Sequence, residues 1–394
     1  PVIDAITHYL PIGVSLIYEN REVTTNHDNN RKAAMIYKVI QWGTGAVGRH
    51  ALRAVLDDPD MQLTGVKVYS EAKVGLDAGH LCDRPDTGIK AVMDPEALPL
   101  AEADCLLYMP MQPDADEIAD LLRRGVNIIT TAGNLYPRAR GDVAWEQLQQ
   151  AALAGNSVFH GSGINPAFMS DVLPLTLSGL SHRARQITVQ EISDVHVYTS
   201  EAPEIMMDNI GFGKTREEAL RPDNPFLDWM SAYFRESMVM MADHMGVTLE
   251  RVEPNHEVAL AKSRVELANG RSIEPGTVAC RRFEWQGIVN GKSAFVLRTY
   301  WKTTMDIDPA WPVESEKEVS WTITVEGTPS YRINLEVCSS FDENHPMFGK
   351  GGEEGAVLGT AVHAVNAIPA VCQAEPGVRT FLDLPIITSH GAFR

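Results

Sequence analysis

The chain has 394 residues, of which 44% are hydrophobic and 22% charged, and 34 Lys and Arg against 52 Asp and Glu give it a net charge of −18. This composition excludes disorder over the whole chain. The acidic balance argues against nucleic acid or an anionic membrane as a partner, because both require a basic surface. Five widely spaced cysteines without a Cys-x-x-Cys pair indicate a reducing compartment, the cytoplasm, rather than a disulfide framework or a zinc site.

The first 34 residues differ from the rest of the chain. Residues 9–18 are apolar but contain Pro11 and Gly13, and residues 20–32 are polar and typical of a loop. The segment lacks the basic start and the cleavage site of a signal peptide. No run of about 20 uninterrupted apolar residues predicts a membrane-spanning helix. We expect residues 1–34 to form a poorly ordered N-terminal extension and the folded chain to begin at Met35.

Strand-like and helix-like segments alternate between residues 35 and 165. This alternation predicts an α/β fold in which a doubly wound parallel sheet, a Rossmann domain, occupies residues 35–165. The expected strands are residues 37–42, 63–69, 104–108, 127–131 and 157–160, and the expected helices are residues 46–56, 114–124 and 143–153.

The pattern changes after residue 165. Helical periodicity in residues 168–180 and 225–245 is followed by a β-rich stretch from residue 256 to residue 339, in which Asn290-Gly291 predicts a hairpin turn. Residues 186–198 also have the pattern of a long strand. We predict an α+β domain over residues 166–345, with a mostly antiparallel sheet and helices on one face. The C-terminal segment, residues 346–394, is expected to return its helix 353–372 to the Rossmann domain.

A Gly-x-Gly-x-x-Gly sequence lies between the first predicted strand and the first helix. Gly43 is expected to make the tight turn, Gly45 to admit a pyrophosphate, and Gly48 to let the helix pack on the strand. The free N–H groups at the start of this helix favour an anion. This context predicts binding of NAD or NADP to the segment Gly43-Thr44-Gly45-Ala46-Val47-Gly48.

The end of the second strand is where the sequence should distinguish NADP from NAD. An acid there binds the ribose 2′-hydroxyl and repels a 2′-phosphate. Ser70 stands at that place, and Ser70 with Lys73 suits a phosphate, whereas Glu71 suits a hydroxyl. The sequence favours NADP and leaves NAD open.

Two further loops follow parallel strands, at the edge of the sheet where such folds bind ligands. They contain Met109-Pro110 and Thr131-Ala132-Gly133, and we expect them to flank the nicotinamide. Pro and Gly are also common turn residues, so the same loops are compatible with turn chemistry alone.

The junction between the two domains reads His160-Gly-Ser-Gly-Ile-Asn165-Pro166. Asn165-Pro166 has the form of a helix start, with Pro at the first helical position. Asn165 and the free N–H groups of that helix are then expected to face the cleft between the domains, although a hinge with a capping Asn explains the same residues.

The stretch YKVIQWGTGAVGRHALRAVL, residues 37–56, resembles the dihydrodipicolinate reductase-like superfamily. Within it, the chain from Met35 onward is similar to 2,4-diaminopentanoate dehydrogenases and the native amine dehydrogenases. The similarity is carried by GINPAFMSDVLPL (163–175), IGFGKTREE (210–218), AVHAVNAIP (361–369), Pro376-Gly377 and Asp383-Leu384-Pro385. The resemblance implies a dimerising second domain, an active site between the domains, and NAD(P)-dependent conversion between an amine and a ketone or aldehyde through an imine.

The chain departs from that family at one place. The resemblance implies a catalytic glutamate in the segment that reads Ala132-Gly133-Asn134-Leu135 here. Asn134 can orient a group by hydrogen bonding but cannot carry a proton. Replacements for the acid–base group are sought in His160 and on the long strand, in Asp194, His196 and Tyr198; alternatively, these last three only alternate across a sheet.

Three functions remain open from the sequence. The first is an NAD(P)H-dependent oxidoreductase acting on the C–N bond of a small amine and its ketone or aldehyde, as a homodimer, with His196, Tyr198, Asn134 and Asn165 as the candidate catalytic residues. The second is a reductase of a carbonyl or a ring C=N bond, which the missing glutamate favours. The third is a dinucleotide-binding protein without catalysis. Twelve histidines without metal-ligand spacing predict no metal site.

Overall fold

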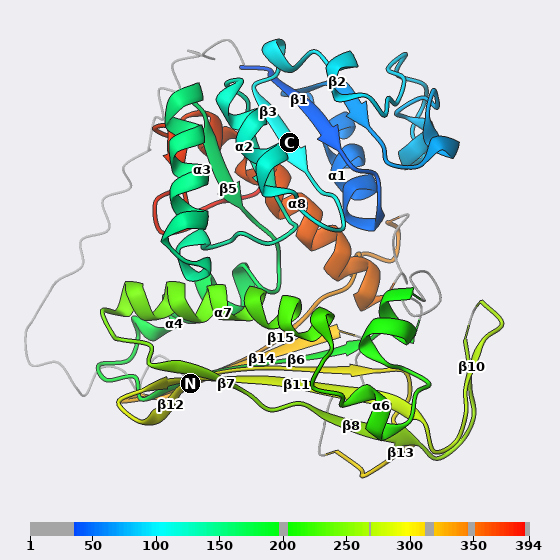
Figure 1. Ribbon diagram of the computed structural model, residues 1–394, viewed down its shortest axis with the longest axis vertical. Coiled ribbons are helices and arrows are strands. Elements are labelled where there is room, and N and C mark those ends of the chain that lie inside the picture. The colour runs from blue at the N-terminus through cyan, green and yellow to red at the C-terminus, as the bar shows by residue number, and fades with distance from the viewer. Residues whose placement is uncertain (1–34, 197–203, 268, 312–318, 346–350, 391–394) are drawn as a thin grey trace, which may run out of the picture. The chain divides into compact units, whose positions relative to one another are not determined.

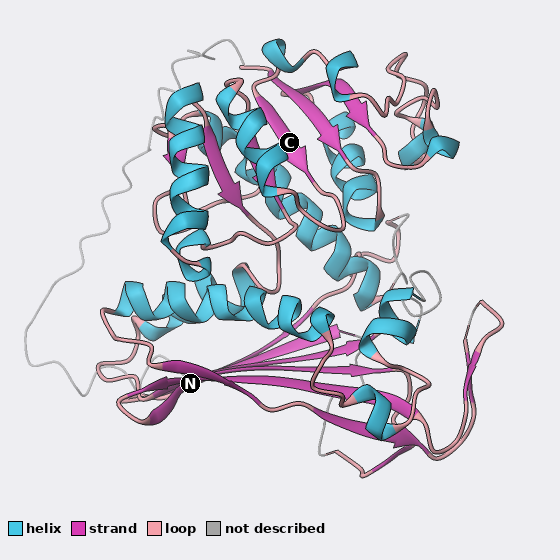
Figure 2. Ribbon diagram, viewed as in Figure 1, coloured by secondary structure: helices cyan, strands magenta, loops and turns pink. Residues whose placement is uncertain are grey.

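The computed structural model describes residues 35–196, 204–267, 269–311, 319–345 and 351–390, arranged around two β-sheets (Figures 1 and 2). The expected N-terminal extension and Tyr198 lie outside these residues. The first sheet is formed before residue 162 and at the C-terminal end, and the second from residue 186 onward. The predicted fold class, a Rossmann-type sheet followed by an α+β part, is confirmed.

The first sheet has six parallel strands in the order β16-β5-β4-β3-β1-β2. The sequence pattern predicted five of them, and β16 is an addition from the C-terminal segment. Their bounds are β1 Tyr37–Trp42, β2 Met61–Lys67, β3 Cys105–Tyr108, β4 Asn127–Thr130, β5 Val158–Gly161 and β16 Gly377–Val378.

Helices cover both faces of this sheet. Val39 of β1 packs with α1 (Ala46–Asp57) and α8 (Gly352–Cys372) on one face, and Ile40 packs with α2 (Ala115–Arg123) and α3 (Asp142–Gly155) on the other. Successive side chains of a strand point to opposite faces, so a sheet covered on both sides needs apolar residues in unbroken runs. Strand β3 (CLLY) is such a run, whereas β1 (YKVIQW) and β2 (MQLTGVK) also contain polar residues. Short 3-10 helices connect the elements: η1 Glu71–Lys73, η2 His80–Cys82, η3 Pro95–Ala97, η4 Leu100–Glu102 and η5 Pro137–Arg140.

Helix α8 is the C-terminal helix that was expected to pack against the Rossmann domain. It lies against α1 and strands β3–β5. By length and composition, residues 354–372 are apolar enough to cross a membrane. Ala361, Ala364, Ile368 and Val371 are fully buried in the core beneath the sheet. Packing in that core accounts for the apolar residues on the buried side of the helix, which is 39% of the apolar window.

The second sheet has the order β13-β8-β11-β12-β6-β14-β15, with β7 paired to β11. Among the described pairs only β12 and β6 run parallel, so the prediction of a mostly antiparallel sheet is confirmed. The strands are β6 Gln186–Asp194, β7 Arg251–Pro254, β8 Glu257–Ala261, β11 Val278–Val289, β12 Lys292–Lys302, β13 Ile307–Asp308, β14 Val319–Glu326 and β15 Tyr331–Glu336. A separate ribbon pairs β9 (Val265–Glu266) with β10 (Ser272–Ile273).

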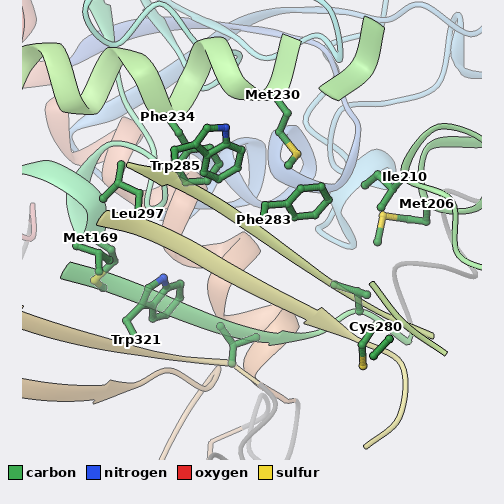
Figure 3. Packing of buried hydrophobic residues seen from close by; sticks show 14 of the residues in the cluster. Met169, Met206, Ile210, Met230, Phe234, Cys280, Phe283, Trp285, Leu297 and Trp321 are labelled. Carbon is green, nitrogen blue, oxygen red and sulfur yellow. The ribbon is translucent and has the colours of Figure 1, made fainter. Parts of the chain in front are cut away.

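Helix α7 (Pro225–Met245) lies along one face of the second sheet (Figure 1). Phe234 stacks on Trp285 with ring centroids 4.0 Å apart, and Figure 3 shows Met230 and Phe283 in the same layer. The same helix also contacts the first domain, because Tyr233 donates a hydrogen bond to the Ala132 carbonyl at 2.8 Å. Contacts on both sides explain why the helix lacks a purely polar face.

The segment between the two sheets differs in detail from the sequence prediction. A π-helical turn, η6 (Phe168–Val172), precedes α4 (Leu173–Ser178), and two short helices follow β6, η7 (Glu204–Ile210) and α6 (Arg216–Ala219). The expected helix start at Asn165-Pro166 is wrong, since the helical residues begin at Phe168 and the Asn165 side chain bonds to other side chains instead of capping a helix.

Candidate active site

One cavity of about 1060 Å³ extends between the two sheets. Its walls come from the start of α1, from the loops after β3, β4 and β5, from β6 and β12, and from η7 and α7. The carboxyl edge of a parallel sheet is where doubly wound folds bind ligands, and here the second sheet and α7 close that edge. The cavity therefore combines a dinucleotide-type edge with a chamber from the second domain.

The glycine loop opens into this cavity. Gly43 has a φ of +93°, and a Cβ there would lie 2.7 Å from the Met109 carbonyl oxygen; a Cβ on Gly48 would lie 2.2 Å from the Gly43 oxygen. Gly45 has no atom within 4 Å of its Cβ position and lines the cavity. It precedes α1, whose first turn contains no acid. These residues fit a dinucleotide, since uncapped helical N–H groups and an open approach suit a pyrophosphate.

Lys73 and Thr44 lie together beside the glycine loop. The Lys73 ammonium donates to the Thr44 carbonyl at 2.8 Å and lies 3.3 Å from its hydroxyl. Ser70 is exposed at the start of η1, three residues before Lys73. The cavity lining does not include Gly43 and Thr44 of the loop, nor Ser70 and Lys73, which lie beside it.

The two predicted loops line the cavity together. Their residues in the lining are Met109, Pro110, Thr131, Ala132 and Gly133. Gly133 has a φ of +87°, and a Cβ there would lie 2.1 Å from the Tyr233 ring. Tyr233 thus occupies the space that any side chain at Gly133 would need.

Of the four catalytic candidates, Asn165 alone lines the cavity within the described part of the chain. Asn134 adopts a left-handed conformation with φ +58° and is not in the lining. His196 follows β6, where its backbone N–H donates to Asp194 Oδ1 at 3.0 Å, and it too is absent from the lining.

His160, which the sequence analysis named as a possible acid–base group, is fully buried in β5. Its Nδ1 lies 2.7 Å from the Arg379 carbonyl oxygen, and its ring meets Phe381 edge-on. Burial lowers the pKa of His160 to about 4, and the residue does not line the cavity. It packs the C-terminal segment against the sheet.

Glu191 lines the cavity, and the sequence analysis missed it. It lies on β6 at the third inward-facing position, following Ile187 and Val189. The alternation of buried and partly exposed residues along β6 leads one to expect an apolar side chain there. Trp301 Nε1 donates to Glu191 Oε1 at 3.1 Å, and Trp321 Nε1 donates to Oε2 at 3.3 Å. Asn165 Nδ2 also donates to Oε2, so the predicted Asn165 and the missed Glu191 form one unit.

The Glu191 carboxyl is the only acid among the described residues that line the cavity, and Arg140 is the only cation. Arg140 Nε binds the buried Glu236 carboxylate at 2.5 Å, so its charge is balanced elsewhere. Burial raises the pKa of Glu191, while the hydrogen bonds from Asn165, Trp301 and Trp321 act to lower it. Most of the other walls are apolar, with Ile205, Met206, Phe226, Trp229, Met230 and Phe234.

A glycine loop at the edge of a parallel sheet, opening into a mostly apolar chamber, is the arrangement expected of an oxidoreductase that uses a nicotinamide dinucleotide. Comparison with known proteins narrows the class. Residues 168–392 match the family of the 2,4-diaminopentanoate dehydrogenase C-terminal domain. An amine dehydrogenase of Streptomyces virginiae is 31% identical over 373 residues, covering 91% of this chain and 98% of that protein.

Two further relatives agree. The 2,4-diaminopentanoate dehydrogenase of Acetoanaerobium sticklandii is 24% identical over 363 residues, covering 89% of this chain and 93% of that protein. The structure of an amine dehydrogenase from Mycobacterium smegmatis has the same fold, with a TM-score of 0.66 at 19% identity, covering 90% of this chain and 97% of that one. The chain belongs to the 2,4-diaminopentanoate dehydrogenase family, and the resemblance stated from the sequence is confirmed.

Proposed function

We propose that this protein is an NAD(P)-dependent amine dehydrogenase that converts a ketone or aldehyde and ammonia to an amine, or the reverse. One observation carries the proposal: a single cavity joins the open side of Gly45 to an apolar chamber that contains one buried carboxyl group, Glu191. Two relatives, one named an amine dehydrogenase and the other a 2,4-diaminopentanoate dehydrogenase, favour this function over the alternatives.

The residues divide into two sets under this proposal. The loop from Gly43 to Gly48 holds the pyrophosphate, and Met109, Pro110 and residues 131–133 flank the nicotinamide ring. When bound, the dinucleotide supplies or accepts a hydride at the carbon of the C=N bond. Phe226, Trp229 and Trp301 line the substrate chamber. Their apolar surfaces suit an apolar substrate side chain.

NADP is proposed as the preferred cofactor. The Lys73 ammonium beside Thr44 supports it, because a cation next to the glycine loop attracts a 2′-phosphate. NAD remains the other candidate, with Glu71 available to a ribose hydroxyl.

A second candidate function is reduction of a carbonyl or a ring C=N bond without ammonia. It is favoured by the absence of an acid at Gly133 and Asn134, the place where the family resemblance implies one. The experiment that separates the two is oxidation of NADPH and NADH with a panel of apolar ketones and aldehydes, with and without ammonium at alkaline pH. Consumption that requires ammonium and yields the amine supports the proposal; alcohol formed without ammonium overturns it. No turnover in either direction leads to the non-catalytic hypothesis.

The remaining expectations are proposals with simpler tests. A homodimer is expected from the family resemblance and is measured by light scattering after size-exclusion chromatography. A cytoplasmic location is supported by five cysteines, all of them unpaired. The boundaries proposed at residues 165/166 and 345/346 are tested by limited proteolysis.

A further inference from the structure

We propose that Glu191 is the catalytic acid–base residue of this protein and the binding group for the substrate nitrogen, in place of the glutamate that the chain lacks after β4. This inference rests on the proposed amine dehydrogenase function and assigns the residue that handles its protons. It is carried by the place of Glu191 in the cavity and by the neutral donors that hold it there.

The first argument is charge. The described residues that line the cavity offer one acid, Glu191, and the one cation among them, Arg140, is bound to Glu236. Glu191 receives hydrogen bonds from neutral donors only, from Asn165, Trp301 and Trp321. A buried carboxylate that faces an apolar chamber without a counter-ion favours a ligand that brings a positive charge. An ammonium or iminium nitrogen is such a ligand.

The second argument is available geometry. An ionised carboxyl group has about four acceptor positions on its two oxygens. Oε2 receives hydrogen bonds from Asn165 and Trp321, and Oε1 receives one, from Trp301. Oε1 therefore retains acceptor capacity, and the Glu191 side chain lines the cavity. Asn165, which also receives a hydrogen bond from Ser170 at 2.5 Å, fixes the orientation of the carboxyl group.

The third argument explains why the acid is on β6. A side chain at position 133 would collide with the Tyr233 ring, which is itself held by its hydrogen bond to the Ala132 carbonyl. Asn134, which has a left-handed backbone conformation, does not line the cavity. The chain therefore provides no acid from the loop after β4, and Glu191 provides the one carboxyl group from a different element.

The proton steps balance as follows. The Glu191 carboxylate takes a proton from ammonium, and the resulting ammonia forms a C–N bond to the carbonyl carbon, giving a carbinolamine after proton transfer from nitrogen to oxygen. The protonated Glu191 returns its proton to the hydroxyl group, the C–O bond breaks, and water leaves as the iminium forms. Addition of a hydride to the iminium carbon moves the C=N π electrons to nitrogen and yields the amine. Glu191 ends as the carboxylate that began the cycle. Its raised pKa suits a group that must both take and return a proton.

The test compares the wild type with Glu191→Gln, Glu191→Asp and the control Glu326→Gln. Glu326 is at the end of β14, in the same sheet and outside the cavity lining. For each protein one measures the melting temperature and the NADPH affinity by fluorescence. The kcat and the KM for ammonium are measured from pH 6 to 10. Calorimetry gives the binding of n-butylammonium and of neutral n-butanol.

We expect Glu191→Gln to bind NADPH normally and to lose kcat by about 100-fold or more. It should also bind n-butylammonium about tenfold more weakly while n-butanol binding is unchanged. The wild-type fall in activity toward acid pH should be absent from the Gln variant and present in Glu191→Asp, which should recover part of the rate. A purely structural role would not move the cation preference or the pH profile.

Two outcomes overturn the inference separately from the function. If the wild type aminates a ketone and Glu191→Gln keeps its kcat and its preference for n-butylammonium, Glu191 is not the acid–base residue although the function stands. If Glu191→Gln unfolds, the Glu191→Asp variant provides the test. A folded Asp variant whose activity no longer falls toward acid pH contradicts the proposal. A wild type with no ammonium-dependent turnover refutes the proposed function itself.

Discussion

The three glycines of the loop differ in what a side chain would meet, and this gives the first prediction. Gly45→Val places its side chain in the open cavity, so the protein should fold while the affinity for the cofactor falls by about 100-fold, on the order of 3 kcal/mol. Gly48→Val should instead destabilise the fold, because its Cβ would lie 2.2 Å from the Gly43 oxygen. Melting temperature and NADPH titration separate the two. Unchanged affinity in folded Gly45→Val would contradict the cofactor site.

Lys73 gives a second prediction at the same scale. Lys73→Gln removes the cation beside Thr44 and keeps a polar side chain of similar length. We expect the KM for NADPH to rise by about tenfold and the KM for NADH to stay within about twofold, since loss of one charge-assisted contact is worth roughly 1.5 kcal/mol. Lys90→Gln, in which Lys90 pairs with Asp77 away from the cavity, is the control. Equal effects on both cofactors would argue against a 2′-phosphate site.

Local sequence could predict the glycine loop, because its conformation depends on neighbouring residues and on one strand–helix unit. Glu191 could not be predicted in the same way. Its inward position was visible from alternation with Ile187 and Val189, but the hydrogen bonds from Trp301 and Asn165 join residues 110 and 26 positions away. Whether an inward acid is paired, solvated or catalytic depends on such distant partners. His196 was chosen for its chemistry and its place on the long strand, and Asn134 for its place in the segment where the resemblance implies a glutamate; the cavity lining includes neither.

At the scale of elements, α7 connects the second sheet to the first domain. The Glu236 carboxylate is fully buried. It accepts hydrogen bonds from Arg140 Nε at 2.5 Å and from the Tyr136 backbone N–H at 2.9 Å. Burial raises the pKa of Glu236, and the opposite charge of Arg140 acts to lower it. These contacts of Glu236 anchor α7 to the segment that follows β4.

Glu236→Ala should lower the free energy of unfolding by about 3 kcal/mol, because it leaves the Arg140 charge and the Tyr136 N–H without their partner. Asp228→Ala is the matched control: Asp228 is exposed in the first turn of the same helix, and its loss should matter by less than about 1 kcal/mol. Urea unfolding of both variants measures the difference. Equal stabilities would show that the ion pair does not hold α7.

Elements were predicted well where the periodicity was long. Helix α7 and the C-terminal helix have bounds within a residue of those expected. Strand β16 was missed because two residues, Gly377 and Val378, carry no periodic signal; only the neighbouring strand β5 makes them a strand. The helix start at Asn165-Pro166 was wrong because a tertiary contact, the hydrogen bond to Glu191, took the Asn side chain that a cap requires.

At the scale of the whole molecule, Asp171 joins the segment between the sheets to α7. It is fully buried, and Ser237 of α7 donates to its Oδ2 at 2.6 Å. Burial raises the pKa of Asp171 from 3.8 to about 7, although the hydrogen bonds from Ser237 and the Val172 backbone act to lower it. The folded protein therefore retains a proton that the unfolded chain releases near pH 4.

The contribution of Asp171 to stability should follow this proton. Between about pH 4 and pH 7 Asp171 binds more proton in the folded chain than in the unfolded chain, so its contribution to the free energy of unfolding should fall as the pH rises through this window and level off above it. Burial lowers the pKa of His160 and His256 to about 4, so these histidines change the stability in the opposite direction, and the Asp171 contribution is read as a difference between variants. The contribution of Asp171 is at most on the order of 4 kcal/mol, from about three pKa units. Asp171→Asn accepts the Ser237 hydrogen bond without titrating, so the free energy of unfolding of the wild type, measured relative to that of Asp171→Asn, should fall as the pH rises from 4.5 to 7.5. Ser237→Ala keeps the titrating carboxyl group and removes a bond that lowers its pKa, so the fall in stability should extend to higher pH. Urea unfolding at a series of pH values measures all three proteins, and parallel curves for the wild type and Asp171→Asn would show that another group carries the pH dependence.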